Sequence, residues 1–180
     1  YLEMKEENRL LREAFALPKE GNTPRLFAEV ISRDTKDAFF SLTINRGSMD
    51  GVRVGLSVTV GKDRLIGRVA TVSLTSAKVY LLSHPESTIA PRVAGTPIQG
   101  VIRGDHSLGL IFDMALSGEK LISGSPLITS GLGDELPKDL LIGVIGEVRP
   151  SADRLFQQAV VVTPSGEGDI RFVSIVMPPV

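Results

Sequence analysis

The chain has 180 residues, 42% of them hydrophobic, with a net charge of −1 and no cysteine. This charge balance gives no electrostatic reason to expect nucleic-acid binding, and the lack of cysteine excludes disulfides, thiol nucleophiles and zinc–thiolate sites. Because His84 and His106 are the only histidines, we do not expect a histidine-rich metal centre, and we expect no cofactor.

Residues 1–17 are rich in strong helix formers, and Pro18 ends the predicted helix because its ring disfavours the α conformation at the preceding residue. Apolar residues recur along this segment at alternating spacings of 3 and 4, which is the pattern of a coiled-coil seam. We therefore expect a parallel homodimer in which Asn8 fixes the register, while Glu7 at position g faces Arg12 at the following position e of the partner helix. The predicted seam consists of Tyr1, Met4, Asn8, Leu11 and Phe15.

The same helix has a second possible arrangement, folded back on the body of its own chain. Met4, Leu11 and Phe15 would then be core contacts, and Leu10 and Leu17, which lie off the seam, suit that geometry. An isolated helix of this length is marginal in water, since roughly 12–15 residues is the lower limit even for alanine-rich peptides. Both arrangements therefore require a packing partner.

After a linker at 18–24, the chain is dominated by β-branched residues and punctuated by glycine. Period-two alternation predicts a strand at 39–44, and the turn-rich Asn45–Gly51 separates it from a hairpin of 54–60 and 65–72. Further short strands are predicted at 79–82, 89–93, 98–103, 108–112, 127–129, 141–148, 159–163 and 170–176.

This number of strands is too large for one small barrel. We therefore expect a mainly β fold, in which an N-terminal coiled-coil helix is followed by two small β-barrel-like subdomains. The predicted subdomains cover residues 25–94 and 95–180, and the last strand is free to return to the first of them.

Chymotrypsin-like serine hydrolases are also built on two β-barrels, so their catalytic residues have to be looked for. His84, Asp113 and either Ser125 or Ser130 are the residue types required for base, acid and nucleophile. However, no serine lies in a Gly-x-Ser-x-Gly elbow, and Ser125 precedes a proline, which lacks the N–H that an oxyanion would need. We predict no catalytic residues and no enzymatic activity, with a serine hydrolase as the less favoured alternative.

A second alternative is a module that binds the cell wall without catalysis. Such sites usually offer aromatic platforms, and the chain has two tyrosines and no tryptophan. Adjacent carboxylates at Asp134-Glu135 do not predict the separated pair of a glycosidase. The Gly166–Asp169 string lacks the strand, glycine-rich loop and helix of a nucleotide site.

Several motifs follow one another in a fixed order, beginning with Glu7-Asn8-x-x-Leu11 and Ala28-Glu29-Val30-Ile31-x-Arg33-Asp34. They continue with Ile44–Gly55, Leu65–Val69, Thr129–Gly133 and Ile142–Ile145. In this order the chain resembles the family of bacterial rod-shape-determining MreC proteins over roughly residues 3–176. The turn-forming positions within these motifs are Asn45, Gly47, Gly51, Gly67, Thr129, Ser130, Gly131, Gly133 and Gly143.

The residues themselves predict how some of these positions act. Gly47 and Gly51 are expected to take positive φ in a tight reversal, and Gly67 is expected to mark a bulge or a close backbone approach. The chain departs from the family at Gly124-Ser125, where the family often has Gly-Asp, and at Pro137-Lys138-Asp139, where it often has Pro-x-Gly. Both departures fall at turns, and an aspartate is able to adopt positive φ at some cost.

The resemblance implies a non-enzymatic scaffold of the cell-elongation machinery, which organises peptidoglycan synthesis and rod shape. It implies a homodimer or higher self-assembly that binds the elongation-specific transpeptidase, a penicillin-binding protein, and its glycosyltransferase. MreD and the actin-like filament, the latter indirectly or across the membrane, are the other partners implied.

The resemblance also implies one membrane span in the inner (cytoplasmic) membrane, with this region periplasmic or otherwise extracytoplasmic. The chain begins at Tyr1, inside the helical pattern and without an initiator methionine. We therefore expect it to be a fragment whose membrane anchor lies upstream.

Overall fold

The computed structural model describes residues 23–33, 41–61, 63–87, 89–105, 109–116, 118, 120–131, 136–163 and 170–178. Within these ranges the chain forms strands and one short 3₁₀-helix, η1 (Ser48–Asp50), without any α-helix. This confirms the predicted mainly β fold, whereas the predicted coiled-coil helix lies outside the described residues. The strands are β1 (Arg25–Arg33), β2 (Ser41–Ile44), β3 (Ser57–Val60), β4 (Arg64–Val72), β5 (Ala77–Leu81), β6 (Pro91–Val93), β7 (Val101–Asp105), β8 (Gly109–Leu116), β9 (Pro126–Thr129), β10 (Leu141–Pro150), β11 (Phe156–Val162) and β12 (Phe172–Val176).

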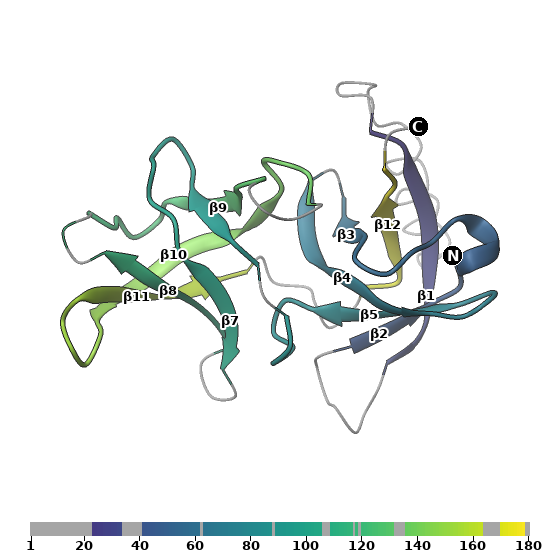
Figure 1. Ribbon diagram of the computed structural model, residues 1–180, viewed down its shortest axis with the longest axis horizontal. Coiled ribbons are helices and arrows are strands. Elements are labelled where there is room, and N and C mark those ends of the chain that lie inside the picture. The colour runs from purple at the N-terminus through teal and green to yellow at the C-terminus, as the bar shows by residue number, and fades with distance from the viewer. Residues whose placement is uncertain are drawn as a thin grey trace, which may run out of the picture.

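Six strands close into a barrel, which we call the first lobe. Their order is β3–β12–β1–β2–β5–β4, and the pairing of β4 with β3 completes the ring. Every neighbouring pair in the ring is antiparallel. The last strand of the chain, β12, lies between β1 and β3, so the chain returns to complete the lobe with which it began (Figure 1).

Alternation of side chains along the strands fills the inside of this barrel. Val58, Gly67 and Leu81 form one row across β3, β4 and β5, and a Cβ added to Gly67 would overlap the carbonyl oxygen of Tyr80. The pairing of β3 with β4 also shifts register beside this row, so Gly67 lies both at a bulge and at a close backbone approach. The buried core comprises Ala28, Leu42, Ile44, Val52, Leu56, Val58, Ile66, Val69, Ala77, Val79, Leu81, Ile170, Val173 and Ile175.

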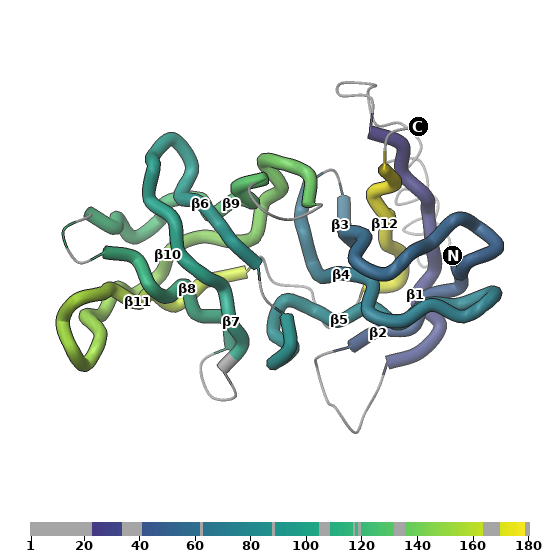
Figure 2. The backbone as a smooth tube through the Cα atoms, in the orientation of Figure 1, coloured from purple at the N-terminus to yellow at the C-terminus, as the bar shows by residue number. Residues whose placement is uncertain are grey.

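The other six strands, β6 to β11, form the second lobe. They are ordered β6–β9–β10–β11–β8–β7. Two isolated bridges, Ile89↔Ile102 and Arg92↔Gln99, connect the two ends of this series. Figure 2 shows the chain leaving the first lobe after β5, running through these strands and ending in β12. The second core comprises Leu65, Leu82, Ile89, Val93, Ile98, Ile102, Leu110, Phe112, Ala115, Leu127, Leu136, Leu140, Ile142, Ile145, Ala159 and Val161.

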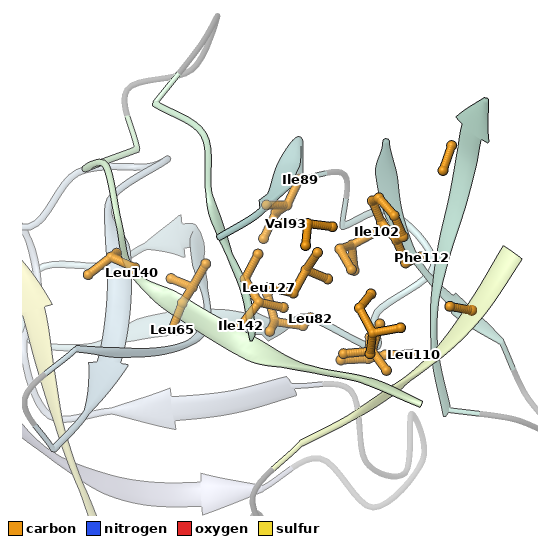
Figure 3. Packing of buried hydrophobic residues seen from close by; sticks show 14 of the residues in the cluster. Leu65, Leu82, Ile89, Val93, Ile102, Leu110, Phe112, Leu127, Leu140 and Ile142 are labelled. Atoms are coloured by element: carbon orange, nitrogen blue, oxygen red, sulfur yellow. The ribbon is translucent and has the colours of Figure 1, made fainter. Parts of the chain in front are cut away.

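The two lobes share a junction rather than a free linker. Leu65, on β4 of the first lobe, packs in the second core beside Leu140 and Ile142 (Figure 3). The Leu141 N–H donates to the Asp63 carbonyl at 2.8 Å, next to a short parallel pairing of β10 with β4.

The cores do not divide at the predicted boundary after residue 94. Ile89 and Val93 precede that boundary but pack in the second core. Packing therefore changes from the first lobe to the second soon after β5, where Leu81 belongs to the first core and Leu82 to the second.

Two other features differ from the sequence prediction. The long strand β1 (Arg25–Arg33) was not predicted, because its residues do not alternate between apolar and polar. The predicted strand 54–60 begins only at Ser57, since the backbone turns before that point and Gly55 takes a positive φ of 94°. The predicted hairpin around Gly61–Asp63 is confirmed by the antiparallel pairing of β3 with β4.

Candidate functional site

The Asn45–Gly51 loop, which carries the first group of motif residues, is fixed to β1 by two side chains. The Glu29 N–H donates to Oδ1 of Asn45 at 2.8 Å. Nε of Arg46 donates to the Phe27 carbonyl at 3.0 Å. The loop is thus held in one position on the barrel by bonds to a strand that precedes it in the chain.

Two glycines of this loop serve different purposes. Gly51 has a φ of 86°, whereas Gly47 has an extended φ of −138°, so the prediction of positive φ was wrong for Gly47. Gly47 is required for space instead, because a Cβ there would overlap the carbonyl of Ser73. The carboxylate of Asp50 accepts the Gly47 N–H at 3.0 Å and closes the turn.

Met49 of this loop and Leu74 of the β4–β5 turn form an exposed apolar pair, which we call the first-lobe tip. The Met49 N–H donates to the Leu74 carbonyl at 3.1 Å, so η1 and the β4–β5 turn are joined through their backbones. Met49 is 76% exposed and Leu74 is 69% exposed. Large apolar side chains on a rigid support are typical of contact surfaces, although single exposed ones also occur without function.

The second group of motif residues holds the segment between β9 and β10. Thr129 is fully buried; its hydroxyl donates to the Pro137 carbonyl at 2.6 Å and accepts the Leu140 N–H at 2.9 Å. The Ser130 hydroxyl donates to the Ala90 carbonyl at 2.9 Å. Both hydroxyls therefore bind backbone and shape this segment.

The remaining motif glycines in this lobe also have backbone roles. Gly131 has a φ of 72°, and a Cβ on Gly143 would lie 2.7 Å from a methyl group of Val161. Asp139 takes a positive φ of 65° where the family often has glycine, and it pairs with Arg92 at 3.3 Å. Gly133 lies outside the described residues.

Sequence reasoning did not assign roles to Arg46 and Asp50, which stabilise the first motif loop. Nη1 of Arg46 lies 3.6 Å from Oδ1 of Asp50. The available signal was the aspartate three residues after Gly47 and directly before Gly51, since Asp in such a position bonds the backbone of a turn.

The side chains considered for a serine hydrolase make structural contacts instead. Asp113 forms an ion pair with Arg103. Nδ1 of His84 accepts the Glu86 N–H at 3.0 Å. The Ser130 hydroxyl binds the carbonyl described above, and none of these bonds joins one candidate to another.

Metal ligands were the other chemistry considered. Within the described ranges, no group of His, Cys, Asp and Glu side chains could hold a metal ion.

A groove of about 480 Å³ is lined by the Val54-Gly55 turn, by residues of β4 and β5, and by Glu86-Ser87. Tyr80, one of its lining residues, is stacked on His84 with 3.7 Å between ring centroids. Nε of Arg68 donates to the Gly55 carbonyl at 3.2 Å. Tyr80 and Arg68 thus have structural contacts within the same chain.

The far end of the second lobe carries another exposed apolar pair, Leu116 and Leu155, which we call the second-lobe tip. Leu155 is 63% exposed and Leu116 is 56% exposed. Leu155 lies in the β10–β11 turn and directly precedes Phe156, which pairs with Leu116. A hydrogen bond from the Ser151 hydroxyl lowers the pKa of Asp153, whose carboxylate also accepts the Leu155 N–H at 3.1 Å.

The predicted coiled-coil seam, the Glu7 and Arg12 charge pair, and His106 all lie outside the described residues. In the part of the chain that the structure describes, no helix is both long and apolar enough to span a membrane.

Comparison with known proteins identifies the family. The family model described as "Rod shape-determining protein MreC, barrel core" matches residues 30–177. The chain belongs to the MreC family. The MreC protein of Listeria monocytogenes is 30% identical over 184 residues, which cover 96% of this chain and 60% of that relative. The chain thus spans about three fifths of the length of this MreC relative.

Solved MreC structures have the same fold. The L. monocytogenes structure is 30% identical with a TM-score of 0.79, covering 97% of this chain and 86% of that one. The major periplasmic domain of "the cell shape-determining filament MreC" is 25% identical with a TM-score of 0.73, covering 86% and 95%. MreC in a complex with Penicillin-Binding Protein (PBP2) from Helicobacter pylori is 15% identical with a TM-score of 0.66, covering 86% and 100%.

Proposed function

We propose that this chain is the extracytoplasmic part of a non-enzymatic, membrane-anchored scaffold of the cell-elongation complex. The observation that carries the proposal is the use of the motif residues. Thr129, Ser130, Gly47 and Asp50 all fix backbone, and the first motif loop and the β4–β5 turn together present the first-lobe tip to solvent. Such an arrangement suits a protein that holds other molecules in place.

The partners proposed follow from the family. The H. pylori complex supports a penicillin-binding transpeptidase as one partner. Its glycosyltransferase, MreD and, across the membrane, the actin-like filament are the others. Through these contacts the scaffold organises peptidoglycan synthesis and rod shape.

Self-assembly is the other part of the proposal. Residues 1–17 pair as a parallel coiled coil through Tyr1, Met4, Asn8, Leu11 and Phe15, as their heptad spacing favours. The second lobe is the second of two barrel-like subdomains. This part of the proposal is supported by the bridges between the two ends of its strand series. The periplasmic domain structure described as a filament is consistent with higher assembly.

The test is depletion of the full-length protein in its own bacterium, with cell shape and sites of peptidoglycan incorporation as readouts. We expect rods to become round, and expect the wild-type protein and the Ser125→Ala, Ser130→Ala double variant to restore them equally. Ser130→Ala removes one hydrogen bond to the backbone, so the variant's expression level must match wild type. Rods that persist after depletion contradict the scaffold, and labelling of either serine by a fluorophosphonate probe points to the hydrolase instead.

A further inference from the structure

Leu10 and Leu17 lie in the predicted coiled coil but not in its seam. With Tyr1 at position a, Leu10 and Leu17 both fall at position c, which faces away from the partner helix. They are seven residues apart, so on a helix they lie on one face at a separation of about 10 Å. An apolar stripe on the outside of a two-helix coil needs a second surface to cover it.

The first-lobe tip offers an apolar pair that is also uncovered. Met49 and Leu74 come from different loops, joined by the Met49 N–H bond to the Leu74 carbonyl at 3.1 Å and by the Ser48 N–H bond to the Ser73 carbonyl at 2.9 Å. These bonds fix the loops with their exposed side chains in place. Figure 1 places η1 and the β4–β5 turn at the end of the first lobe that faces away from the second lobe.

The start of β1 connects to the first motif loop through one residue, Met177. The Pro24 carbonyl accepts the Met177 N–H at 2.9 Å. The Met177 methyl group reaches to within 3.3 Å of the position a Cβ on Gly51 would take, and Gly51 caps η1, which carries Met49. The six residues 18–23 span at most about 20 Å when extended, so the end of a helix over residues 1–17 would lie within reach of the first-lobe tip.

We propose that the first-lobe tip is the docking site for the outer face of residues 1–17 of the same chain, with Leu10 and Leu17 packed on Met49 and Leu74. This contact leaves the seam free for the partner helix and sets the angle at which the coiled coil leaves the barrel. The inference rests on the proposed function, because position c exists only if the helix pairs through its seam.

The test uses the absence of native cysteine. The Leu10→Cys, Leu74→Cys variant and the Leu17→Cys, Met49→Cys variant are oxidised with diamide, which takes up the electrons and protons of the two thiols. Leu10→Cys with Leu155→Cys, at the second-lobe tip, is the matched control. Tethered thiols at a docked contact have a high effective concentration, so we expect the within-chain disulfide to form about tenfold faster than in the control.

A second measurement does not depend on disulfide geometry. Met49→Ser with Leu74→Ser should accelerate tryptic cleavage within residues 1–17 by about tenfold, because local opening controls proteolysis, and Leu155→Ser should leave the rate unchanged. All three substitutions fall on exposed side chains, and circular dichroism checks that the β fold is retained. Equal cleavage rates in the wild type and the double variant overturn the docking.

Failure of this inference is distinguishable from failure of the coiled coil. Asn8→Cys reports the seam, since it gives a disulfide between chains if the helices pair in register. If that disulfide forms but neither double-cysteine variant at positions 49 and 74 forms its disulfide, the docking is wrong and the dimeric scaffold stands. The disulfide of the Leu10→Cys, Leu74→Cys variant can also form between two chains, which a mixture of differently tagged chains detects. If it forms only between chains, the partner's helix lies on the tip, and docking within one chain is wrong.

Discussion

The two lobes are both built from six strands, but they are closed in different ways. In the first lobe each strand pairs with both neighbours, and the ring is completed by β12 from the far end of the chain, with Arg25 opposite Val176. In the second lobe the six strands are consecutive, and two isolated bridges connect its end strands. The first lobe therefore needs a strand from the far end of the chain, whereas the strands of the second lobe, β6 to β11, follow one another in sequence.

The lobes also differ in how they hold their loops. The first motif loop is held from outside by Arg46 and Asn45, which bond to β1. The second motif is held from inside by the fully buried hydroxyl of Thr129. Loss of a bond is more costly where the groups left unpaired are buried, so the second motif is the more sensitive to single substitutions.

Removal of residues 170–180 should separate the stabilities of the two lobes most strongly. It takes away β12 and the buried Ile170, Val173 and Ile175, each worth about 1.5–3 kcal/mol of burial, against a typical domain stability of about 5–15 kcal/mol. We expect hydrogen exchange to show loss of protection throughout β1–β5 with retained protection in β6–β11. Removal of residues 178–180 alone is the control. Equal loss in both lobes would show that their shared junction makes them one cooperative unit.

Thr129→Val should act on the second lobe alone. Valine keeps the shape but removes the hydroxyl, which leaves the Leu140 N–H and the Pro137 carbonyl without that partner, and a buried unpaired group costs about 1–3 kcal/mol. Urea unfolding should report this loss. Thr129→Ser keeps the hydroxyl and should cost about 0.8 kcal/mol, the value of one buried methyl group. A valine variant as stable as the serine variant would show that the two bonds contribute little.

The success of sequence reasoning followed the range of the interactions involved. Local signals predicted the β3–β4 hairpin at Gly61–Asp63 and the special backbone at Gly51 and Gly67. Asp139 took the positive φ expected at a glycine position of the family. The hairpin and the turns at Gly51 and Asp139 depend on a few neighbouring residues, whereas Gly67 was predicted because a glycine inside a strand is itself a signal of a bulge or a close approach.

Features set by distant contacts were missed. β1 has no clean alternation because a register shift between Val30 and Ser32 interrupts its pairing with β2, and the exposure of its side chains rises along its length. Gly47 is fixed by the β4–β5 turn, more than twenty residues away, so its extended φ could not be predicted from its own neighbours. The seam of residues 1–17 remains a prediction, because these residues lie outside the described part of the chain.

The smallest expected effect lies in the β10–β11 turn at the second-lobe tip. The pKa of Asp153 is held below its ordinary value of 3.8 by bonds from the Ser151 hydroxyl and the Leu155 N–H. The charged carboxylate therefore favours the ordered turn above the ordinary pKa, and this contribution is lost as the pH falls through the lowered value. We expect the Leu155 amide to shift in NMR spectra only below about pH 3.8.

Asp153→Asn keeps an acceptor oxygen without the charge, so its Leu155 amide should not titrate. A shift of the same size in that variant would mean that another group controls the turn. Because Asp153 is exposed, the change should stay local, and the exchange rates of β10 and β11 away from the turn should not follow it.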